Sequence, residues 1–348
     1  MAYMAKALLV GAGGMGKAWG KNLLAYGEKV TLAGWVDIRD GAAAAAADGL
    51  EAGGIHTDTD LLRAIDTVKP DFVVDVTIPE AHRDVTLAAL GAGIPVIGEK
   101  PMAHSMAAAR EMVAASERAN KLYMVSQSRR YDARLQAYRA LIAECLGQVG
   151  ILNSDFYLGA HFGGAEHNDF RNRMAHVLIL DMAIHTFDAA RFLLGDTDAV
   201  SVYCDEYNPA WSWYKGGGAS ANALFEMADG VRYTYRGSWC SEGRHTSWES
   251  DWRAVGEKGT AVWDGTGSPA AEIVTERGGF LSTTESETAT VEPDVSSGIA
   301  GSLRDFIKAL ENPSYTPMGE CHDNIKSLAM VFAAIESAAT GQRVKVEA

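Results

Sequence analysis

Three residues of this sequence have side chains that could move a proton at an alcohol. Asp181 and His185 are four residues apart, a spacing that places both side chains on one face of a helix. The aspartate would fix the tautomer of the imidazole and raise its basicity, as a histidine needs when it takes a proton from a secondary alcohol that loses a hydride. Lys100, in the segment 98–101 (GEKP), could orient that hydroxyl or exchange a proton with it. We therefore predict Lys100, Asp181 and His185 as catalytic residues.

Each of these residues also has an ordinary explanation. A lysine in a turn is usually a surface residue, and an aspartate near a histidine is often a helix cap beside a half-buried ring. Metal binding is a further alternative, for which the candidate ligands are His161, His167, His176, Asp181 and His185. None of the strong metal-binding spacings, such as HExxH, is present, so the sequence predicts no metal.

The segment Lys6 to Gly20 (KALLVGAGGMGKAWG) could hold the phosphates of a dinucleotide. Its apolar run is typical of a strand buried on both faces, and Gly11, Gly13 and Gly16 then form GxGxxG before a helix. In this motif the glycines permit a tight turn, a close approach of backbone amides to pyrophosphate, and close packing of helix on strand. A glycine-rich turn without a ligand is the alternative, and the position between a strand and a helix makes it less favoured.

Asp37 follows a second strand-like run about twenty residues beyond the last glycine, where such folds place the acid that binds the adenosine ribose. A carboxylate at that place accepts hydrogen bonds from the 2′-OH and repels a 2′-phosphate. Arg39 could instead pair with that phosphate. The sequence therefore favours NAD over NADP without excluding NADP.

Composition limits the class of protein and its partners. The chain has 348 residues, about two domains in length, with 47% hydrophobic and 22% charged residues, as in a globular protein. Its net charge of −14 argues against nucleic-acid and anionic-membrane partners. No signal-peptide pattern occurs in Met1 to Ala5 and no apolar run has membrane-spanning length, which predicts a cytoplasmic protein. The scattered cysteines are expected to be reduced and not to bind metal: Cys145, Cys204, Cys240 and Cys321.

The first part of the chain alternates strands with helices, which predicts a doubly wound Rossmann domain over residues 1–127. Strands are expected over 7–10, 31–36, 72–76, 95–97 and 122–125, and helices over 42–47, 61–68, 82–90 and 106–118. In an open parallel sheet, ligands bind beyond the carboxyl ends of the strands. The residues that we expect there to bind the cofactor are Gly11, Gly13, Gly14, Met15, Gly16, Asp37, Arg39, Thr77, Pro79, His82, Glu99, Lys100 and Gln127.

The regular alternation of strands and helices ends after residue 127. Helices are expected over 134–146 and 181–194, and strands over 149–158, 200–207, 219–227, 231–239, 252–255 and 261–263. Successive strands with alternating polarity predict a mostly antiparallel sheet in an α+β domain over residues 128–348. Closing helices over 302–310 and 323–339 are expected to return to the first domain.

In this order and spacing, the motifs make the chain resemble the Gfo/Idh/MocA oxidoreductases along essentially its whole length. The motifs are GAGGMG, then VDI, then EKP, then the DxxxH helix, and then the antiparallel sheet. The resemblance implies a Rossmann domain, a second domain whose large sheet commonly assembles dimers or tetramers, and hydride transfer at secondary hydroxyls of sugars or cyclitols. It implies that Lys100 contacts substrate near the nicotinamide, with a Lys100-Pro101 bond that is often cis. It further implies that Asp181 positions substrate, that His185 carries the proton, and that His176 lines the same pocket. The loop 77–82 (TIPEAH) departs from the family's usual Pro-Asn form.

Substrate residues in the second domain are harder to assign. Five tryptophans are concentrated there: Trp211, Trp213, Trp239, Trp248 and Trp252. Indoles suit sugar faces, although aromatic residues in strands more often belong to a core or an interface. We select Trp239, which ends a strand and opens a polar loop, and Tyr131, which follows the strand end at Gln127. The predicted substrate-binding set is Lys100, Tyr131, His176, Asp181, His185 and Trp239.

The resulting hypothesis is an NAD-dependent dehydrogenase of a sugar, glycoside or cyclitol that forms a homodimer or homotetramer through the antiparallel sheet. Two alternatives remain open. One is a redox-assisted glycosidase that keeps NAD bound and oxidises a sugar carbon only transiently. The other is a catalytically silent NAD-binding regulator.

Overall fold

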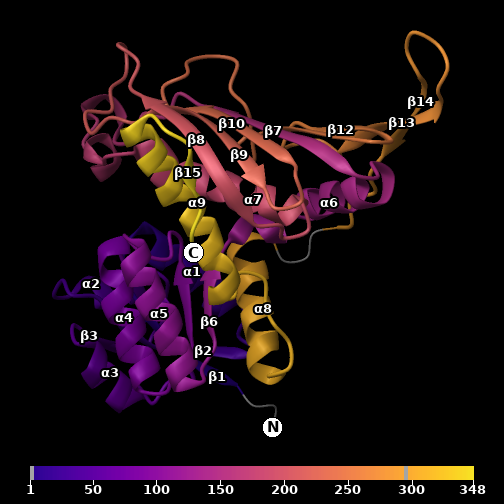
Figure 1. Cartoon of the computed structure of the whole chain (residues 1–348). Coiled ribbons are helices and arrows are strands. Elements are labelled where there is room, and N and C mark those ends of the chain that lie inside the picture. Colours follow the sequence, from indigo (N-terminus) through magenta and orange to yellow (C-terminus); the bar gives the residue numbers. More distant parts are fainter. Residues whose placement is uncertain (1–3, 294–296) are drawn as a thin grey trace. The chain divides into compact units, whose positions relative to one another are not determined.

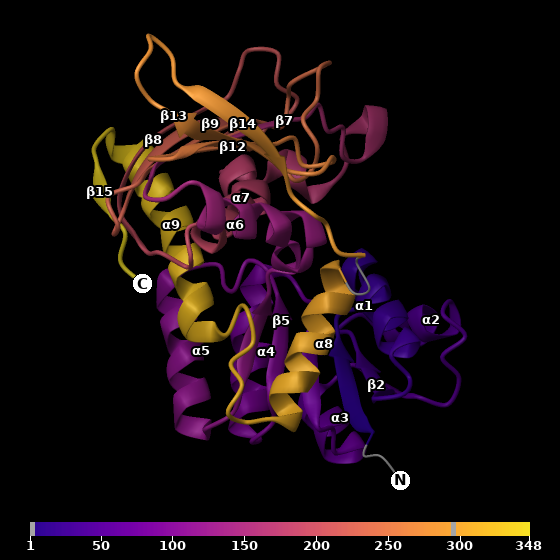
Figure 2. The same cartoon turned by 90° about the vertical axis from the view of Figure 1, so that its right-hand side faces the viewer.

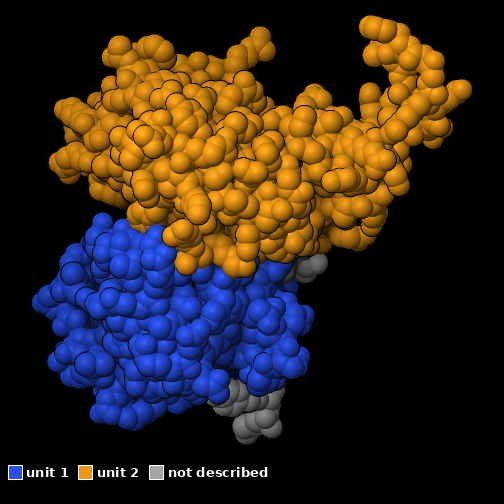
Figure 3. Space-filling view, viewed as in Figure 1, with its two compact units in different colours: residues 1–128, 296–325 blue, residues 129–295, 326–348 orange. Residues whose placement is uncertain are grey.

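The computed structural model describes residues 4–293 and 297–348, so part of the segment considered above for a signal peptide lies outside the described residues. The chain divides into two compact units, coloured separately in Figure 3. The first takes residues 1–128 and 296–325, and the second takes 129–295 and 326–348. Among the helices described, none has both the length and the apolar character needed to cross a bilayer.

The first unit is built on a six-stranded parallel sheet with the order β3-β2-β1-β4-β5-β6. Its central strands are buried apolar runs, which explains why they occupy the middle of the sheet. The strands are β1 (Ala5–Val10), β2 (Val30–Val36), β3 (His56–Asp58), β4 (Phe72–Asp75), β5 (Val96–Glu99) and β6 (Tyr123–Ser126).

Helices accompany this sheet, as Figure 1 shows for α1 to α5 in the indigo to magenta part of the chain. They are α1 (Gly14–Ala25), α2 (Ala42–Asp48), α3 (Leu61–Val68), α4 (Pro79–Gly91), α5 (Met106–Ala119) and α8 (Gly298–Glu311). α8 comes from the far end of the chain and packs here, with the Phe306 ring 5.4 Å from the Phe72 ring. The predicted Rossmann fold is confirmed.

The second unit is built on a nine-stranded mixed sheet with the order β14-β13-β12-β11-β7-β10-β9-β8-β15. Only the β10–β7 pair among its described strands is parallel. The strands are β7 (Val149–Tyr157), β8 (Ala199–Tyr207), β9 (Ser220–Met227), β10 (Arg232–Ser238), β11 (Asp251–Gly256), β12 (Gly259–Trp263), β13 (Ala270–Glu276), β14 (Thr283–Thr288) and β15 (Val344–Lys345). The predicted antiparallel α+β architecture is confirmed.

One face of the second sheet is covered by helices α6 (Ala133–Cys145), α7 (Ile184–Leu193) and the C-terminal part of α9 (Cys321–Thr340), as Figure 2 shows. Phe187 of α7 packs edge-on against Phe225 and Tyr235 of the sheet, at centroid distances of 4.8 and 5.3 Å. Alternate residues of β10 and β11 point to the opposite face, which is the outer face of this sheet.

The structure corrects three expectations about elements. The continuous helix expected over 181–194 begins earlier, as a π-helical segment over Leu178–Ala183, and becomes α-helical only at α7. β13 and β14 form a hairpin where no strand was expected, because β14 is exposed along its whole length and carries no apolar alternation. The three-residue strand β3 was also missed, because it is too short to show a period.

Candidate active site

The glycine loop of the first unit connects β1 to α1 and leaves room for a ligand at its tip. A Cβ on Gly11 would lie 2.6 Å from the Val76 carbonyl oxygen, and one on Gly16 would lie 2.1 Å from the Gly11 carbonyl oxygen, so neither position tolerates a side chain. A Cβ on Gly13 or Gly14 would meet no described atom within 4 Å. Within the described chain, the N-terminus of α1 has no side-chain cap, so its first amides face open space. Backbone with this shape fits a pyrophosphate.

Asp37 follows β2 and is ready to accept hydrogen bonds as a carboxylate. It is only 7% exposed and accepts a hydrogen bond from the Ala12 amide at 2.7 Å, which ties it to the glycine loop. Arg39 donates to both carboxylate oxygens at 2.9 Å, and this lowers the pKa of Asp37 to about 2. The exposed guanidinium of Arg39 thus neutralises the acid in the absence of a ligand.

The loop that follows β4 is held to the loop that follows β5 by His82. The ring nitrogens of this buried histidine lie 3.0 Å from the Pro101 carbonyl oxygen and 3.1 Å from that of Thr77. His82 therefore acts through the backbone of both loops, while Pro79 begins α4 beside it. The Lys100-Pro101 bond is cis, as the family resemblance implies.

Glu99 and Lys100 end β5 in different environments. Glu99 is buried, and burial raises the pKa of its carboxyl. Its side chain accepts a hydrogen bond from the Trp19 indole at 2.7 Å and a second from the Lys100 amide at 3.2 Å. These two hydrogen bonds hold Glu99 to α1 and to the backbone at Lys100, which is half-buried.

Gln127, at the end of β6, offers a donor without a protein partner. Its side chain is buried, and its Nε2 atom has no hydrogen-bond partner in the part of the chain that the structure describes. A buried amide without a partner at the carboxyl end of a strand in this sheet is a donor that a bound dinucleotide would satisfy. The first unit therefore brings its predicted residues to the carboxyl edge of one sheet, and they fit the predicted cofactor.

In the second unit, Asp181 lies in the π-helical segment just before α7. Arg171 donates to its carboxylate at 2.7 Å and lies over the Phe162 ring at 4.6 Å. This arginine also contacts Asp169 at 3.3 Å. Single π turns are frequent at functional sites because they re-aim a side chain within a helix. No local pattern in the sequence pairs Arg171 with Asp181, ten residues further along the chain.

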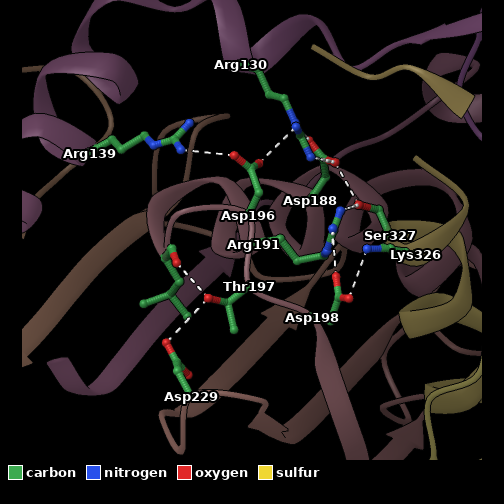
Figure 4. A network of polar contacts seen from close by, with 11 residues as sticks. Arg130, Arg139, Asp188, Arg191, Asp196, Thr197, Asp198, Asp229, Lys326 and Ser327 are labelled. Atoms are coloured by element: carbon green, nitrogen blue, oxygen red, sulfur yellow. Dashed lines mark hydrogen bonds and ion pairs between the residues drawn. The ribbon is translucent and has the colours of Figure 1, made fainter. Parts of the chain in front are cut away.

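His185 is in the first turn of α7, and a buried ionic network fixes that helix (Figure 4). Arg130 donates to both oxygens of Asp188 at 2.7 Å, and both side chains are 2% exposed. Ser327 of α9 donates to the same carboxylate at 2.7 Å. Tyr131, which follows Arg130, is buried at the end of a short 3₁₀ helix (Ser128–Tyr131).

His176 is paired with a residue that the sequence did not single out. Its Nδ1 lies 2.5 Å from Glu206 of β8, and this hydrogen bond raises the pKa of the imidazole. The contact spans thirty residues between a loop and a strand, so no local pattern reports it.

Trp239 belongs to the aromatic core of the second unit. It is 1% exposed and packs against Phe156 and Phe162 at centroid distances of 5.0 and 5.3 Å, with Trp248 at 5.5 Å. The ring offers no open face to a sugar, so this placement does not support the platform role predicted for it. Trp213 instead stacks on His161 at 3.9 Å.

Two of the histidines considered as metal ligands have glutamate partners. His161 pairs with Glu242 at 2.5 Å, and His176 pairs with Glu206. They form no group of converging metal-ligating atoms with Asp181 and His185 among the described residues. Lys100 belongs to the first unit, and Asp181 and His185 belong to the second, so the meeting of all three on one substrate stays a prediction.

Relatives of known name resemble this chain over most of its length. D-apiose dehydrogenase of Paraburkholderia graminis is 27% identical over 293 residues, which cover 80% of this chain and 73% of that protein. Inositol 2-dehydrogenase 4 of Saccharopolyspora erythraea is 33% identical over 199 residues, 56% and 55% of the two chains. A crystal structure of an Agrobacterium radiobacter oxidoreductase in complex with NAD+, L-tartaric acid and magnesium has the same fold. Its TM-score is 0.84, at 22% identity, with 99% of both chains covered.

Two family models match the two parts of the chain in order. The model of an oxidoreductase family with an NAD-binding Rossmann fold matches residues 5–127. The model of the GFO/IDH/MocA C-terminal domain matches residues 135–262. The chain therefore belongs to the Gfo/Idh/MocA family of NAD-binding oxidoreductases.

Proposed function

We propose that this oxidoreductase is an NAD-dependent dehydrogenase of a secondary hydroxyl group in a sugar, glycoside or cyclitol. The observation that carries the proposal is the Asp181 carboxylate, which Arg171 holds at 2.7 Å directly before the helix that bears His185. Two relatives named for the oxidation of D-apiose and of inositol support the substrate class.

In this proposal each residue has one task. His185 accepts the hydroxyl proton, and Asp181 positions the substrate and favours the protonated imidazole that results. Arg171 holds the Asp181 carboxylate in place by donating a hydrogen bond to it. Lys100 contacts the same hydroxyl and offsets negative charge that develops on its oxygen, an effect worth a few kcal/mol in such sites. Bound NAD supplies the acceptor of the hydride at C4 of its nicotinamide.

The choice of NAD over NADP rests on Asp37. Its carboxylate is deprotonated at any physiological pH, since its pKa is about 2, and it would repel a 2′-phosphate. Arg39 is engaged by that same carboxylate, which leaves it less able to recognise a phosphate. The cofactor residues are the glycine loop with Met15, then Asp37, the loop at Thr77 and Pro79, Lys100 and Gln127.

The outer face of the second sheet is proposed as the assembly surface. It carries the half-exposed Val200, Tyr203 and Tyr207 of β8. It is also hollowed by a cavity of about 780 Å³ whose lining includes Asp155 and Arg236. A second copy of the chain would cover these apolar side chains, giving a homodimer or homotetramer. The four cysteines are all free thiols, which supports a reducing, cytoplasmic location.

One assay tests the proposed activity against its alternatives. The protein is incubated with NAD and a panel of sugars, polyols and aryl glycosides, while absorbance of reduced nicotinamide and release of the aglycone are followed in parallel. Steady formation of NADH with at least one polyol or sugar is the expected result. Release of aglycone without NADH would replace the proposal with a redox-assisted glycosidase. Measurable NAD affinity with neither product across the panel would replace it with a silent NAD-binding protein.

A further inference from the structure

Three metal-ligating side chains converge in the first unit, at the beginning of α9. The Cys321 sulfur lies 3.0 Å from Oε1 of Glu320 and 3.5 Å from Nδ1 of His322. The same two atoms of Glu320 and His322 are 2.8 Å apart. One carboxylate oxygen, one sulfur and one imidazole nitrogen thus form a small triangle. No other group of three such donors is present among residues 4–293 and 297–348.

A fourth residue orients the imidazole from the other side. Nε2 of His322 lies 3.0 Å from Oε1 of Glu117 at the end of α5. When Nε2–H donates to Glu117, the lone pair of Nδ1 points toward the triangle. Histidine ligands of metals are commonly held in this way, with one nitrogen on the cation and the other donating to a carboxylate.

We propose that Glu320, Cys321 and His322 bind one divalent transition-metal ion of the zinc class, with Glu117 as the residue that positions His322. Sulfur, imidazole nitrogen and carboxylate oxygen are the ligand types that select such ions, whereas Mg²⁺ and Ca²⁺ prefer oxygen alone. Three protein ligands leave a fourth tetrahedral position to water, and the His322 side chain is half-exposed.

One of the three distances agrees with this assignment, and the other two require a small movement of Glu320. Zinc–ligand bonds of about 2.0 to 2.3 Å at tetrahedral angles place the ligand atoms roughly 3.3 to 3.6 Å apart. The sulfur–nitrogen distance of 3.5 Å already lies in that range. The two shorter distances both involve Glu320, whose side chain is partly exposed and would have to move by about half an ångström.

The backbone beneath the site connects it to the cofactor edge of the sheet. The Gly319 carbonyl accepts a hydrogen bond from the Val125 amide at 2.8 Å, and Glu320 forms a bridge with Met124. Gly319 has a φ of +87°, and a Cβ there would lie 2.4 Å from the Val125 carbonyl oxygen, so the approach requires glycine. A bound ion would fix the start of α9 against β6, two residues before Gln127. The site is thus structural, and it is independent of the proposed substrate.

The competing explanation is an ordinary helix cap. Glu320 also accepts a hydrogen bond from the His322 amide at 2.9 Å through its second oxygen, as capping carboxylates do. A cap of this kind requires no cation and makes no use of the Cys321 sulfur, which gives the two explanations different consequences.

Cobalt(II) distinguishes them, because a cobalt–thiolate bond produces a charge-transfer absorption band. The full-length protein, freed of metal with a chelator, is titrated with Co²⁺, and Zn²⁺ is then added. We expect one Co²⁺ per chain, a sulfur-to-cobalt band, and loss of the band when Zn²⁺ displaces cobalt. Cys321→Ser should abolish the band, and His322→Gln, at a half-exposed position that the fold tolerates, should weaken binding at least tenfold.

Two further variants complete the design. Glu117→Gln should weaken Co²⁺ binding about tenfold while leaving the band in place at saturation, as expected for a residue that only orients a ligand. Cys145→Ser, which removes a thiol far from the group in sequence and in the other unit, should bind Co²⁺ like the parent protein. Substoichiometric binding, or an unchanged band in Cys321→Ser, would overturn the proposal in favour of the cap.

Discussion

At the scale of the residue, the charges of the candidate site are set by partners that lie close in space. Arg171 donates to the Asp181 carboxylate. Arg39 and the Ala12 amide donate to Asp37, and the pKa of this carboxyl is lowered to about 2, so it serves as an acceptor over the whole physiological pH range. The expected hydrogen-bond donors differ between the two acids. Asp37 should accept hydrogen bonds from the ribose diol, and Asp181 should accept them from the imidazole or the substrate.

The proton-accepting role of His185 gives a direct kinetic expectation. His185→Ala should lower kcat at least a hundredfold, about 2.7 kcal/mol in activation free energy, because a general base is removed. Affinity for NAD should be nearly unchanged, since the glycine loop and Asp37 belong to the other unit. Steady-state kinetics and calorimetric titration with NAD measure the two quantities. A kcat close to that of the parent protein would remove His185 from the mechanism.

Substitutions of Asp37 and of Arg39 are expected to affect the preference for NAD over NADP differently. Asp37→Asn keeps the size of the side chain and an oxygen for the Ala12 amide but loses the charge, so the preference for NAD over NADP should fall at least tenfold, about 1.4 kcal/mol. Arg39→Ala should leave that preference intact or increase it, because Asp37 is then free of its partner. Dissociation constants for both dinucleotides decide the matter. If Arg39→Ala instead abolished the preference, the arginine would be the selecting residue.

The His176–Glu206 pair predicts a pH-dependent stability. The pKa of His176 is raised in the folded protein, so the pair stabilises the fold fully below the ordinary histidine pKa of about 6.5, and this contribution is lost as pH rises through the folded value. Glu206→Gln should therefore lower the melting temperature more at about pH 6 than at about pH 9. Thermal unfolding at both pH values measures the difference. Equal losses would mean that Glu206 stabilises the fold without regard to the charge of His176.

Some residues of the candidate site could be predicted from the sequence and others could not. The difference lies in how far apart the interacting residues are along the chain. The glycine loop, Asp37, Lys100 and the Asp181–His185 pair are recognisable because local spacing carries their chemistry. The contact of Glu206 with His176 joins residues 30 positions apart, and the hydrogen bond from Trp19 to Glu99 joins residues 80 positions apart. No periodicity in the sequence indicates such pairs. Trp239 was selected for its place at a strand end, but the strand delivers it into the core.

At the scale of the element, α7 depends on a buried ionic network. Asp188 accepts from Arg130 and Ser327, and Arg191 donates to Ser327 at 3.0 Å and to Asp198 at 3.1 Å (Figure 4). The helix that bears His185 is thus fixed by groups one and two turns along it. The attraction within a buried ion pair offsets the cost of removing both charges from water, so a buried charge left without its partner is strongly destabilising.

Replacing Arg130 should reveal how much stability is lost when the buried Asp188 has no partner. Arg130→Ala leaves the Asp188 carboxylate buried without its bidentate partner, so the free energy of unfolding should fall by about 3 to 5 kcal/mol. Arg139→Ala is the matched control in the same network. Its guanidinium is a third exposed and contacts the half-exposed Asp196, so the loss should be about 1 kcal/mol or less. Urea unfolding measures both. Similar losses in the two variants would show that the network is not held by its buried pair.

Helices and strands were predictable where burial gave them a period. The parallel strands of the first unit are continuous apolar runs, and β9 and β10 alternate as expected of a sheet with one covered face. The π-helical turn at Leu178–Ala183 has no such signature, because its residues suit an α-helix equally well.

At the scale of the whole molecule, the proposed assembly surface can be tested by charge. Replacing both Tyr203 and Tyr207 with glutamate would place two like charges on the outer face of β8 in each copy, which should convert the oligomer to monomer. Leu62→Glu, at an exposed position of α3 in the first unit, is the control and should leave the oligomer intact. Sedimentation velocity gives the mass of each species. An unchanged oligomer in the double variant would place the interface elsewhere.

The first unit is built from two separate segments of the chain, and this has a consequence for biosynthesis. Its Rossmann strands are translated first, but α8 and the start of α9 leave the ribosome only after nearly two hundred further residues, which takes roughly 10 to 40 s at ordinary elongation rates. During that interval Phe72 has no Phe306 to pack against, and the strand β6 lacks its bond from Val125 to Gly319. The unit that is translated first is therefore completed only after most of the second unit has been made, and the nascent chain presents an unfinished apolar surface to chaperones while β7 to β14 are synthesised.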